Sequence, residues 1–182
     1  RRARSATQKI ELNRSALDLN SVVEDVIELL KFDISRYDVS IHLDLAPRLP
    51  LVEADAIQIQ QVVINLARNG MEAMSTLGSM SRYLTIETTV DREGFVRINV
   101  KDNGPGFSED MKDKLFFPFA TTKKEGMGIG LTICSTIIED HDGKISAEKE
   151  PNGPTVFSIK LPPLRSIQSA PETQMQDGDL AQ

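Results

Sequence analysis

The chain has 182 residues, of which 40% are hydrophobic and 26% are charged, as in an ordinary globular domain. Its formal net charge of -6, with two Tyr and no Trp, argues against a nucleic-acid-binding protein. A single cysteine, Cys134, excludes an internal disulfide framework, and no apolar run reaches the roughly 20 residues of a membrane-spanning helix. We therefore expect a cytoplasmic domain. Because the chain begins with Arg1 and carries no signal-peptide pattern, we also expect a piece of a longer polypeptide, which could be soluble or membrane-anchored.

The two ends of the chain differ in composition from its middle. Residues 1–14 carry Arg and Lys in excess over a single acidic residue and show no apolar periodicity, so we expect the end of an upstream helix and a linker. Residues 166–182 are rich in Gln, Ser, Asp and Gly, and burial there would not offset the entropy cost of ordering. This predicts a disordered tail and a folded body over residues 15–165.

The first half of this body alternates between helical and strand patterns. Asn20 is predicted to cap a helix over residues 21–30, whose apolar residues form one buried face. The strict alternation over residues 39–45 predicts a half-buried strand. Asp55 is predicted to cap a long helix that runs to Met74.

The second half predicts two hairpins and a third helix. Residues 84–90 and 95–100 flank a turn with strong turn-forming residues, and residues 144–148 and 155–161 flank another. Between them, residues 126–138 form a helical pattern that opens with glycines. Three helices and about six strands predict an α+β two-layer sandwich, in which helices cover one face of a mixed, mostly antiparallel sheet.

The long helix carries polar residues that a scaffold does not need. Asn65, Asn69 and Glu72 are spaced four and three residues apart, so their side chains share one stripe of the helix. Asn competes with the backbone for hydrogen bonds and disfavours helix interiors. An amide oxygen suits Mg²⁺, especially when nucleotide phosphates supply the other ligands. A plainly solvated stripe is the alternative, and the helix alone does not decide between the two.

Two glycine-containing segments follow. Asp102, Gly104 and Gly106 come directly after a predicted strand, where a carboxylate accepts hydrogen bonds and glycines allow a flat ligand to approach; a plain turn is the alternative. Glycines before the third helix would expose N–H groups at the positive end of its dipole, which favours phosphate. A dinucleotide-binding fingerprint is excluded because no strand precedes these glycines, and a Walker loop is excluded because Ile145 follows the only Gly-Lys pair.

Taken together, these segments resemble the nucleotide-binding motifs of the gyrase–chaperone–histidine kinase–mismatch repair ATPase superfamily. Within it, they resemble the ATP-binding catalytic domain of bacterial two-component sensor histidine kinases, in the nitrogen-regulation and oxygen-sensing branch. The motifs that carry this resemblance are Gln60-Gln61-Val62, Asn65-Leu66, Arg68-Asn69, Glu72-Ala73-Met74, Pro118-Phe119, Thr121-Thr122-Lys123 and Gly126-Met127-Gly128. The resemblance covers residues 16–162 and implies that residues 1–8 are the remnant of a dimerisation hairpin.

The resemblance implies a role for each matching residue. Asn69 would ligate the Mg²⁺ that bridges the ATP phosphates, and Asp102 would accept the adenine amino group together with Thr155. Either Lys123 or Lys124 would reach the γ-phosphate from a mobile lid over residues 107–127, which Phe116, Phe117 and Phe119 would dock. The residues implied to bind the nucleotide are Asn65, Asn69, Asp102, Gly104, Gly106, Lys123, Lys124, Gly126, Gly128, Gly130, Leu131 and Thr155. Those implied in catalysis are Asn65, Asn69, Glu72 and Lys123, although Glu72 could equally face solvent.

The resemblance also bears on the reaction. Superfamily members that hydrolyse ATP carry a Glu where this chain has Asn65, and an amide cannot act as a general base. We therefore expect the γ-phosphoryl group to pass to a histidine on an upstream hairpin, and then to an aspartate of a response regulator. His42 is expected on a strand face and His141 as a helix cap, so the chain alone should bind Mg-ATP without phosphorylating itself. It should be a monomer, whereas the parent protein would be a homodimer.

Two alternatives remain: a clamp-type ATPase of the same superfamily, and a nucleotide-responsive docking module without catalysis. The chain also departs from the family pattern. Gly70 stands where Ala is commoner, at a cost of about 1 kcal/mol of helix stability. Asp142 separates His141 from Gly143, and Pro154 precedes Thr155 where relatives usually carry Gly or Ala.

Overall fold

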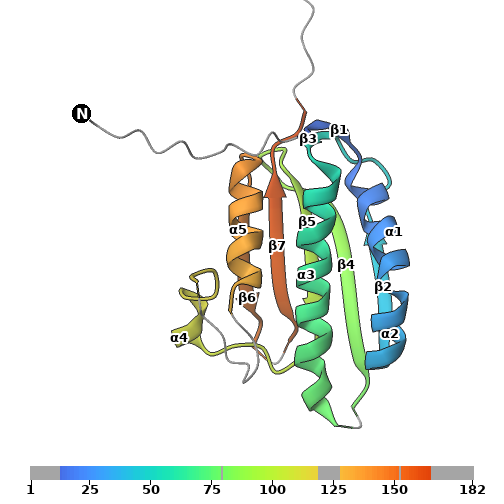
Figure 1. Cartoon of the computed structure of the whole chain (residues 1–182), viewed down its shortest axis with the longest axis vertical. Helices are drawn as coiled ribbons and strands as arrows, with labels where there is room; N and C mark the ends of the chain where they lie inside the picture. Colours follow the sequence, from blue (N-terminus) through green and yellow to red (C-terminus); the bar gives the residue numbers. More distant parts are fainter. Residues whose placement is uncertain (1–12, 79, 119–127, 152, 165–182) are drawn as a thin grey trace, which may run out of the picture.

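Helices cover one face of a five-stranded sheet, with the helices α1, α3 and α5 lying side by side over the strands (Figure 1). The structure, a computed structural model, describes residues 13–78, 80–118, 128–151 and 153–164. The order of the sheet is β2-β4-β5-β7-β6, in which β2 runs parallel to β4 and the other neighbours are antiparallel. Its strands are β2 (Val39–Leu45), β4 (Arg82–Val90), β5 (Val96–Asp102), β6 (Lys144–Lys149) and β7 (Thr155–Leu161). This confirms the predicted two-layer α+β fold with a mixed, mostly antiparallel sheet.

The helices and a small second sheet complete the fold. The helices are α1 (Leu19–Leu29), α2 (Lys31–Tyr37), α3 (Ala56–Met74), the short α4 (Glu109–Lys112) and α5 (Gly130–Asp140), with a 3₁₀ turn over Ser75–Leu77. The second sheet pairs β1 (Ser15–Leu17) with β3 (Val52–Ala54) in antiparallel register. None of the helices in the described part of the chain is long and apolar enough to cross a membrane.

The core lies between the helices and the sheet, and α3 is at its centre. The apolar stripe of α3 is fully buried, while the inward residues of β4, β5 and β7 alternate with outward polar ones. The largest side chains buried in this core are Leu19, Leu30, Ile59, Leu66, Met71, Met74, Leu84, Ile86, Ile98, Ile138, Ile159 and Leu161. Because the apolar face of α3 is buried in this core, the rotation of the helix about its axis is fixed. This determines which of its residues face the loops at the ends of the strands.

One of the two predicted helix caps is wrong. Asp18, not Asn20, caps α1, and its carboxylate accepts the Asn20 N–H at 2.9 Å. The Asn20 side chain instead donates to Ala46 O at 2.8 Å and accepts the Thr88 hydroxyl at 2.7 Å. Asp and Asn are both favourable N-cap residues. Because the Asn20 side chain bonds to Ala46 and to the distant Thr88 on β4, Asp18 is left to cap the helix. The second cap is confirmed, because the Asp55 carboxylate accepts two N–H groups of the first turn of α3.

Other differences concern elements too short for a periodic signal. The helix α2 and the strands β1 and β3 were not predicted, and α2 is followed by the C-cap residue Asp38 in the left-handed region, with φ of 52°. The glycine-opened helix begins at Gly130 rather than at residue 126, and residues 126 and 127 lie outside the described residues. Most of the predicted upstream helix and linker over residues 1–14, and the tail predicted over residues 166–182, also lie outside them.

Candidate functional site

A stripe of α3 connects the two glycine-containing segments. The Asn65 side chain donates from Nδ2 to the carbonyl of Gly130 at the start of α5, at 3.4 Å. Two turns later, Ala73 lies against the loop after β5, since a Cβ on Gly104 would come within 3.3 Å of its Cβ. Residues 65, 69 and 73 share one helix face and span about 12 Å, so Asn69 lies between these two ends. The structure thus brings the amide stripe between the strand-end loop and the α5 N-terminus.

Asp102 ends β5 beneath this stripe and is almost fully buried, with 3% of its surface exposed. Its carboxylate accepts the Gly104 N–H at 2.9 Å. Burial raises the pKa of Asp102 to about 6, while that N–H and the positive charge of Lys149 oppose the rise. A carboxylate so buried is costly for a scaffold, which marks this position as a functional candidate.

The neighbour of Asp102 in the sheet register is Thr155, the first residue of β7. Thr155 is 2% exposed, and its Oγ1 has no hydrogen-bond partner among the described residues. Pro154, which departs from the family pattern, does not separate Thr155 from Asp102. A buried hydroxyl without a partner beside a buried carboxylate is the arrangement expected where a polar ligand supplies the missing hydrogen bond.

Glycines close around these two side chains. Gly106 has a φ of +74°, and a Cβ there would lie 2.9 Å from Thr155 Oγ1. A Cβ on Gly104 would lie 2.7 Å from Asp102 Oδ1. Side chains larger than glycine at these positions would fill the space beside Asp102 and Thr155. The two glycines therefore allow a ligand to approach both side chains closely.

Gly70, which departs from the family pattern, packs directly against Asp102. A Cβ on Gly70 would come within 3.1 Å of Asp102 Cβ and 3.0 Å of Leu84 Cδ1. Contacts this short require a neighbour to move. Gly70 lowers the helix propensity of α3, but the absence of a Cβ there allows the Asp102 side chain to pack closely against the helix.

The N-terminus of α5 has no side-chain cap among the described residues. Ile129 occupies the N-cap position, and its side chain makes no capping hydrogen bond. Gly128 has a φ of +66°, and Leu131 packs against the core. Thr132 in the first turn has a buried Oγ1 without a partner among the described residues. These groups fit an anion such as a phosphate.

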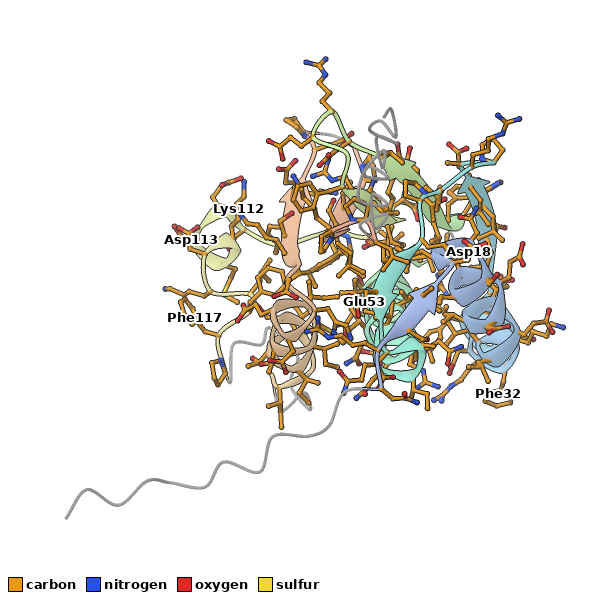
Figure 2. The ribbon with its side chains drawn as sticks, turned by 90° about the horizontal axis from the view of Figure 1, so that it is seen from above. Asp18, Phe32, Glu53, Lys112, Asp113 and Phe117 are labelled. Atoms are coloured by element: carbon orange, nitrogen blue, oxygen red, sulfur yellow. The ribbon has the colours of Figure 1, made fainter. Side chains whose placement is uncertain are left out.

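The remaining predicted residues are placed only in part. Asn69 and Glu72 are half-buried on α3 and both make interactions with other residues. Lys123, Lys124 and Gly126 lie outside the described residues, as does Phe119. Of the other two aromatic residues predicted to dock the lid, Phe116 packs against the core, whereas Phe117 is 62% exposed at the periphery (Figure 2).

Lys149, at the end of β6, was missed by the sequence analysis. Its ammonium donates to Gly104 O at 3.2 Å and to Gly153 O at 2.7 Å. Gly104 is 45 residues away in the chain, so no local pattern could have indicated this contact.

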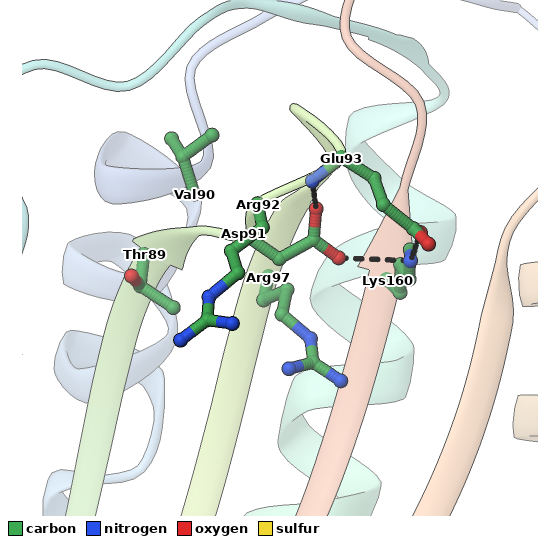
Figure 3. Close-up of a pocket in the computed structure, with 7 residues that line it drawn as sticks. All are labelled: Thr89, Val90, Asp91, Arg92, Glu93, Arg97 and Lys160. Carbon is green, nitrogen blue, oxygen red and sulfur yellow. Dashed lines mark hydrogen bonds and ion pairs between the residues drawn. The ribbon is translucent and has the colours of Figure 1, made fainter.

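A separate hollow lies at the other end of the sheet, around the β4–β5 turn (Figure 3). The Asp91 carboxylate accepts the Glu93 N–H at 3.0 Å and pairs with Lys160 Nζ at 2.8 Å, which lowers the pKa of Asp91. The turn contains none of the predicted site residues. The hollow is therefore a feature of the hairpin rather than of the candidate site.

Comparison with known proteins gives consistent matches. Residues 54–165 match the family described as histidine kinase-, DNA gyrase B- and HSP90-like ATPases. The sensor protein TdiS of Thauera aromatica is 39% identical over 163 residues, which are 89% of this chain and 30% of that protein. The chain thus spans less than a third of this curated relative.

Solved structures show the same fold. The catalytic domain of the histidine kinase ThkA is 35% identical with a TM-score of 0.72, and the match covers 82% of this chain and 95% of that one. ThkA has also been solved in complex with the response regulator protein TrrA, with 34% identity, a TM-score of 0.70 and coverage of 84% and 42%. Full-length ShkA in complex with AMPPNP has a TM-score of 0.75 at 24% identity, covering 86% of this chain and 32% of that one, and this likeness concerns the fold alone.

Proposed function

The chain belongs to the family of histidine kinase-, DNA gyrase B- and HSP90-like ATPases, as an ATPase domain of the sensor histidine kinase type, and we propose that it binds Mg-ATP and donates the γ-phosphoryl group to a histidine on an upstream dimerisation hairpin. The phosphoryl group would then pass to an aspartate of a response regulator. ThkA, whose catalytic domain resembles this chain, forms a complex with a response regulator, which supports this partner class.

The observation that carries the proposal is the buried pair of Asp102 and Thr155. The Asp102 carboxylate is an acceptor for the amino group of adenine, and the Thr155 hydroxyl, which has no partner among the described residues, can complete the recognition. The α5 N-terminus at Gly130 lies at the opposite end of the α3 stripe, where phosphates would bind. One nucleotide would therefore bridge the two ends of the stripe.

Asn69, between these two ends, is the residue that would hold magnesium. Its amide oxygen is a hard, neutral ligand, and the phosphates would supply further ligands. Magnesium, when bound, neutralises phosphate charge and so favours phosphoryl transfer. Asn65 would line the same phosphates, Glu72 would orient a group near them, and Lys123 or Lys124 would reach the γ-phosphate.

The phosphoryl acceptor would come from outside this chain. His141 is buried with both ring nitrogens in hydrogen bonds, to Ile137 O at 2.7 Å and from the Asp55 N–H at 3.0 Å. His42 is exposed on β2, where its ring contacts Tyr83. Asn65 cannot take a proton from water, so the γ-phosphoryl would remain available for a protein nucleophile. We propose that this chain is a monomer and that the parent protein is a homodimer.

Competition between nucleotides tests the proposal. A carboxylate acceptor favours the amino group of adenine and repels the carbonyl oxygen at the same position of guanine, so ATP should bind more tightly than GTP. The variant Asp102→Asn replaces a pure acceptor with an amide and should bind ATP weakly and discriminate less. Equal affinity for ATP and GTP, or full affinity in Asp102→Asn, would contradict this pocket. Rapid hydrolysis of free ATP would instead favour the clamp-type ATPase.

A further inference from the structure

Lys149 joins two loops that close the proposed adenine pocket. Its Nζ donates to the carbonyl of Gly104, in the loop after β5, and to that of Gly153, in the β6–β7 turn. Its stem also lies beside Gly106, since a Cβ on that glycine would come within 2.7 Å of Lys149 Cδ. Gly106 in turn faces the Thr155 hydroxyl. One side chain thus contacts both loops around Asp102 and Thr155.

Lys149 also brings the charge that acts on Asp102. Among the described residues, Lys149 is the one charged side chain that shifts the pKa of Asp102. The other neighbours of Asp102 named above are uncharged, namely Gly70 on α3, Leu84 on β4, Thr155 on β7 and the Gly104 N–H. The neighbouring Lys101 pairs with Glu87 at 2.9 Å instead. Burial raises the pKa of Asp102, and the Gly104 N–H and then the ammonium of Lys149 favour its ionised form.

The ionisation state decides what Asp102 can recognise. Oδ1 is already occupied by the Gly104 N–H, which leaves Oδ2 for a ligand. A proton on Oδ2 would turn an acceptor into a donor facing the amino group of adenine, another donor. Adenine recognition by this pocket therefore requires the ionised carboxylate.

We propose that Lys149 is a positioning residue of the adenine pocket, whose ammonium fixes the Gly104 and Gly153 loops and places a positive charge on the loop that hydrogen-bonds to Asp102. This inference rests on the proposed function. It adds a residue on β6 that contacts none of the reacting groups and acts through Asp102.

The test compares Lys149→Met, which keeps the length of the stem but loses the charge, with Lys149→Arg, which keeps the charge. Lys144→Met, on the exposed end of the same strand, is the matched control. Carbon-13 NMR titration of the Asp102 carboxyl group follows its pKa without nucleotide, and calorimetry follows binding of a non-hydrolysable ATP analogue between pH 5.5 and 8.5. The NMR signal and the binding curve together separate an effect on ionisation from a general loss of fold.

Lys149→Met should raise the Asp102 pKa by about 1, moving the pH below which binding is lost upward by a similar amount. Lys149→Arg and Lys144→Met should both keep the wild-type midpoint. An unchanged Asp102 pKa in Lys149→Met, with the wild type binding nucleotide, would overturn the role of Lys149. A wild type that binds no nucleotide at any pH would overturn the proposed function instead.

Discussion

The backbone N–H of Asp55, where α3 begins, donates a hydrogen bond to Nε2 of the buried His141, where α5 ends, at 3.0 Å. Because Nε2 accepts, Nδ1 carries the proton and donates to Ile137 O at 2.7 Å. A single neutral imidazole thus joins the two helices whose other ends lie at the candidate nucleotide site, α5 at the phosphate end and α3 at the adenine end. This agrees with the predicted capping role of His141 and gives it a second role, between helices.

Replacing this imidazole should lower stability. His141→Phe retains an aromatic ring but leaves a buried N–H and a buried carbonyl without partners, so the free energy of unfolding should fall by about 1–3 kcal/mol. His42→Phe, on the exposed strand β2, is the control and should change it by less than about 0.5 kcal/mol. Denaturant unfolding measures both. Equal effects of the two substitutions would contradict the role of His141.

Two buried threonines should respond in opposite ways to the same substitution. Thr88 uses its hydroxyl twice, since it donates to Asn20 and accepts the Ala46 N–H at 3.0 Å, so Thr88→Val should cost about 1–3 kcal/mol of stability. Thr155 has no partner among the described residues, so Thr155→Val should leave stability unchanged or raised while weakening ATP binding. Thermal unfolding and nucleotide titration of both variants check this contrast. A Thr155→Val protein that loses as much stability as Thr88→Val would refute the claim that this hydroxyl awaits a ligand.

The buried, ionised Asp102 carboxylate should lower the free energy of unfolding at neutral pH, where it would bind adenine. The pKa of Asp102 is raised from 3.8 to about 6 in the folded protein. Protonation of Asp102 therefore contributes favourably to the free energy of unfolding, fully below pH 4, and this contribution is lost as the pH rises through 6. Asp102→Asn should therefore be more stable than the wild type at pH 8, by about 1–3 kcal/mol, with a smaller difference at pH 5. Denaturant unfolding at the two pH values measures this difference. A difference that is independent of pH would show that the buried carboxylate is not its cause.

Gly70 tests the packing beneath the same carboxylate. Gly70→Ala would gain about 1 kcal/mol of helix propensity on a surface position, but here its Cβ would meet Asp102 and Leu84 at about the 3 Å contacts described above. We expect a net loss of stability and weaker ATP binding. Unfolding and binding of this variant are the measurements, and a stabilised variant with full affinity would mean that the helix can shift without disturbing Asp102.

The sequence predicted those features whose signals are local. The cap at Asp55, the strand alternations and the hairpins depend on residues a few positions apart, and the structure confirms them. Asn20 and Asp18 are both good caps at neighbouring positions, and the choice between them depends on Thr88, 68 residues away. Lys149 could not be identified because its role arises only when the loop after β5 meets the β6–β7 turn.

The same distinction applies to the candidate site. The amide stripe and Asp102 could be singled out by residue type and spacing, whereas the meaning of Gly70 depends on a contact with a strand 32 positions further on. The Thr155 hydroxyl has no partner among the described residues, and it lies beside Asp102 only because β7 pairs with β5, which no local pattern indicates. Sequence motifs located the candidate residues, and packing explains why neighbouring positions carry glycine.

The most direct test of the central claim is calorimetric titration of this chain with a non-hydrolysable ATP analogue, with and without Mg²⁺. The account predicts one nucleotide per chain, bound more tightly when Mg²⁺ is present, with the enhancement lost in Asn69→Ala. Absence of binding under both conditions would contradict it and favour the docking module without catalysis.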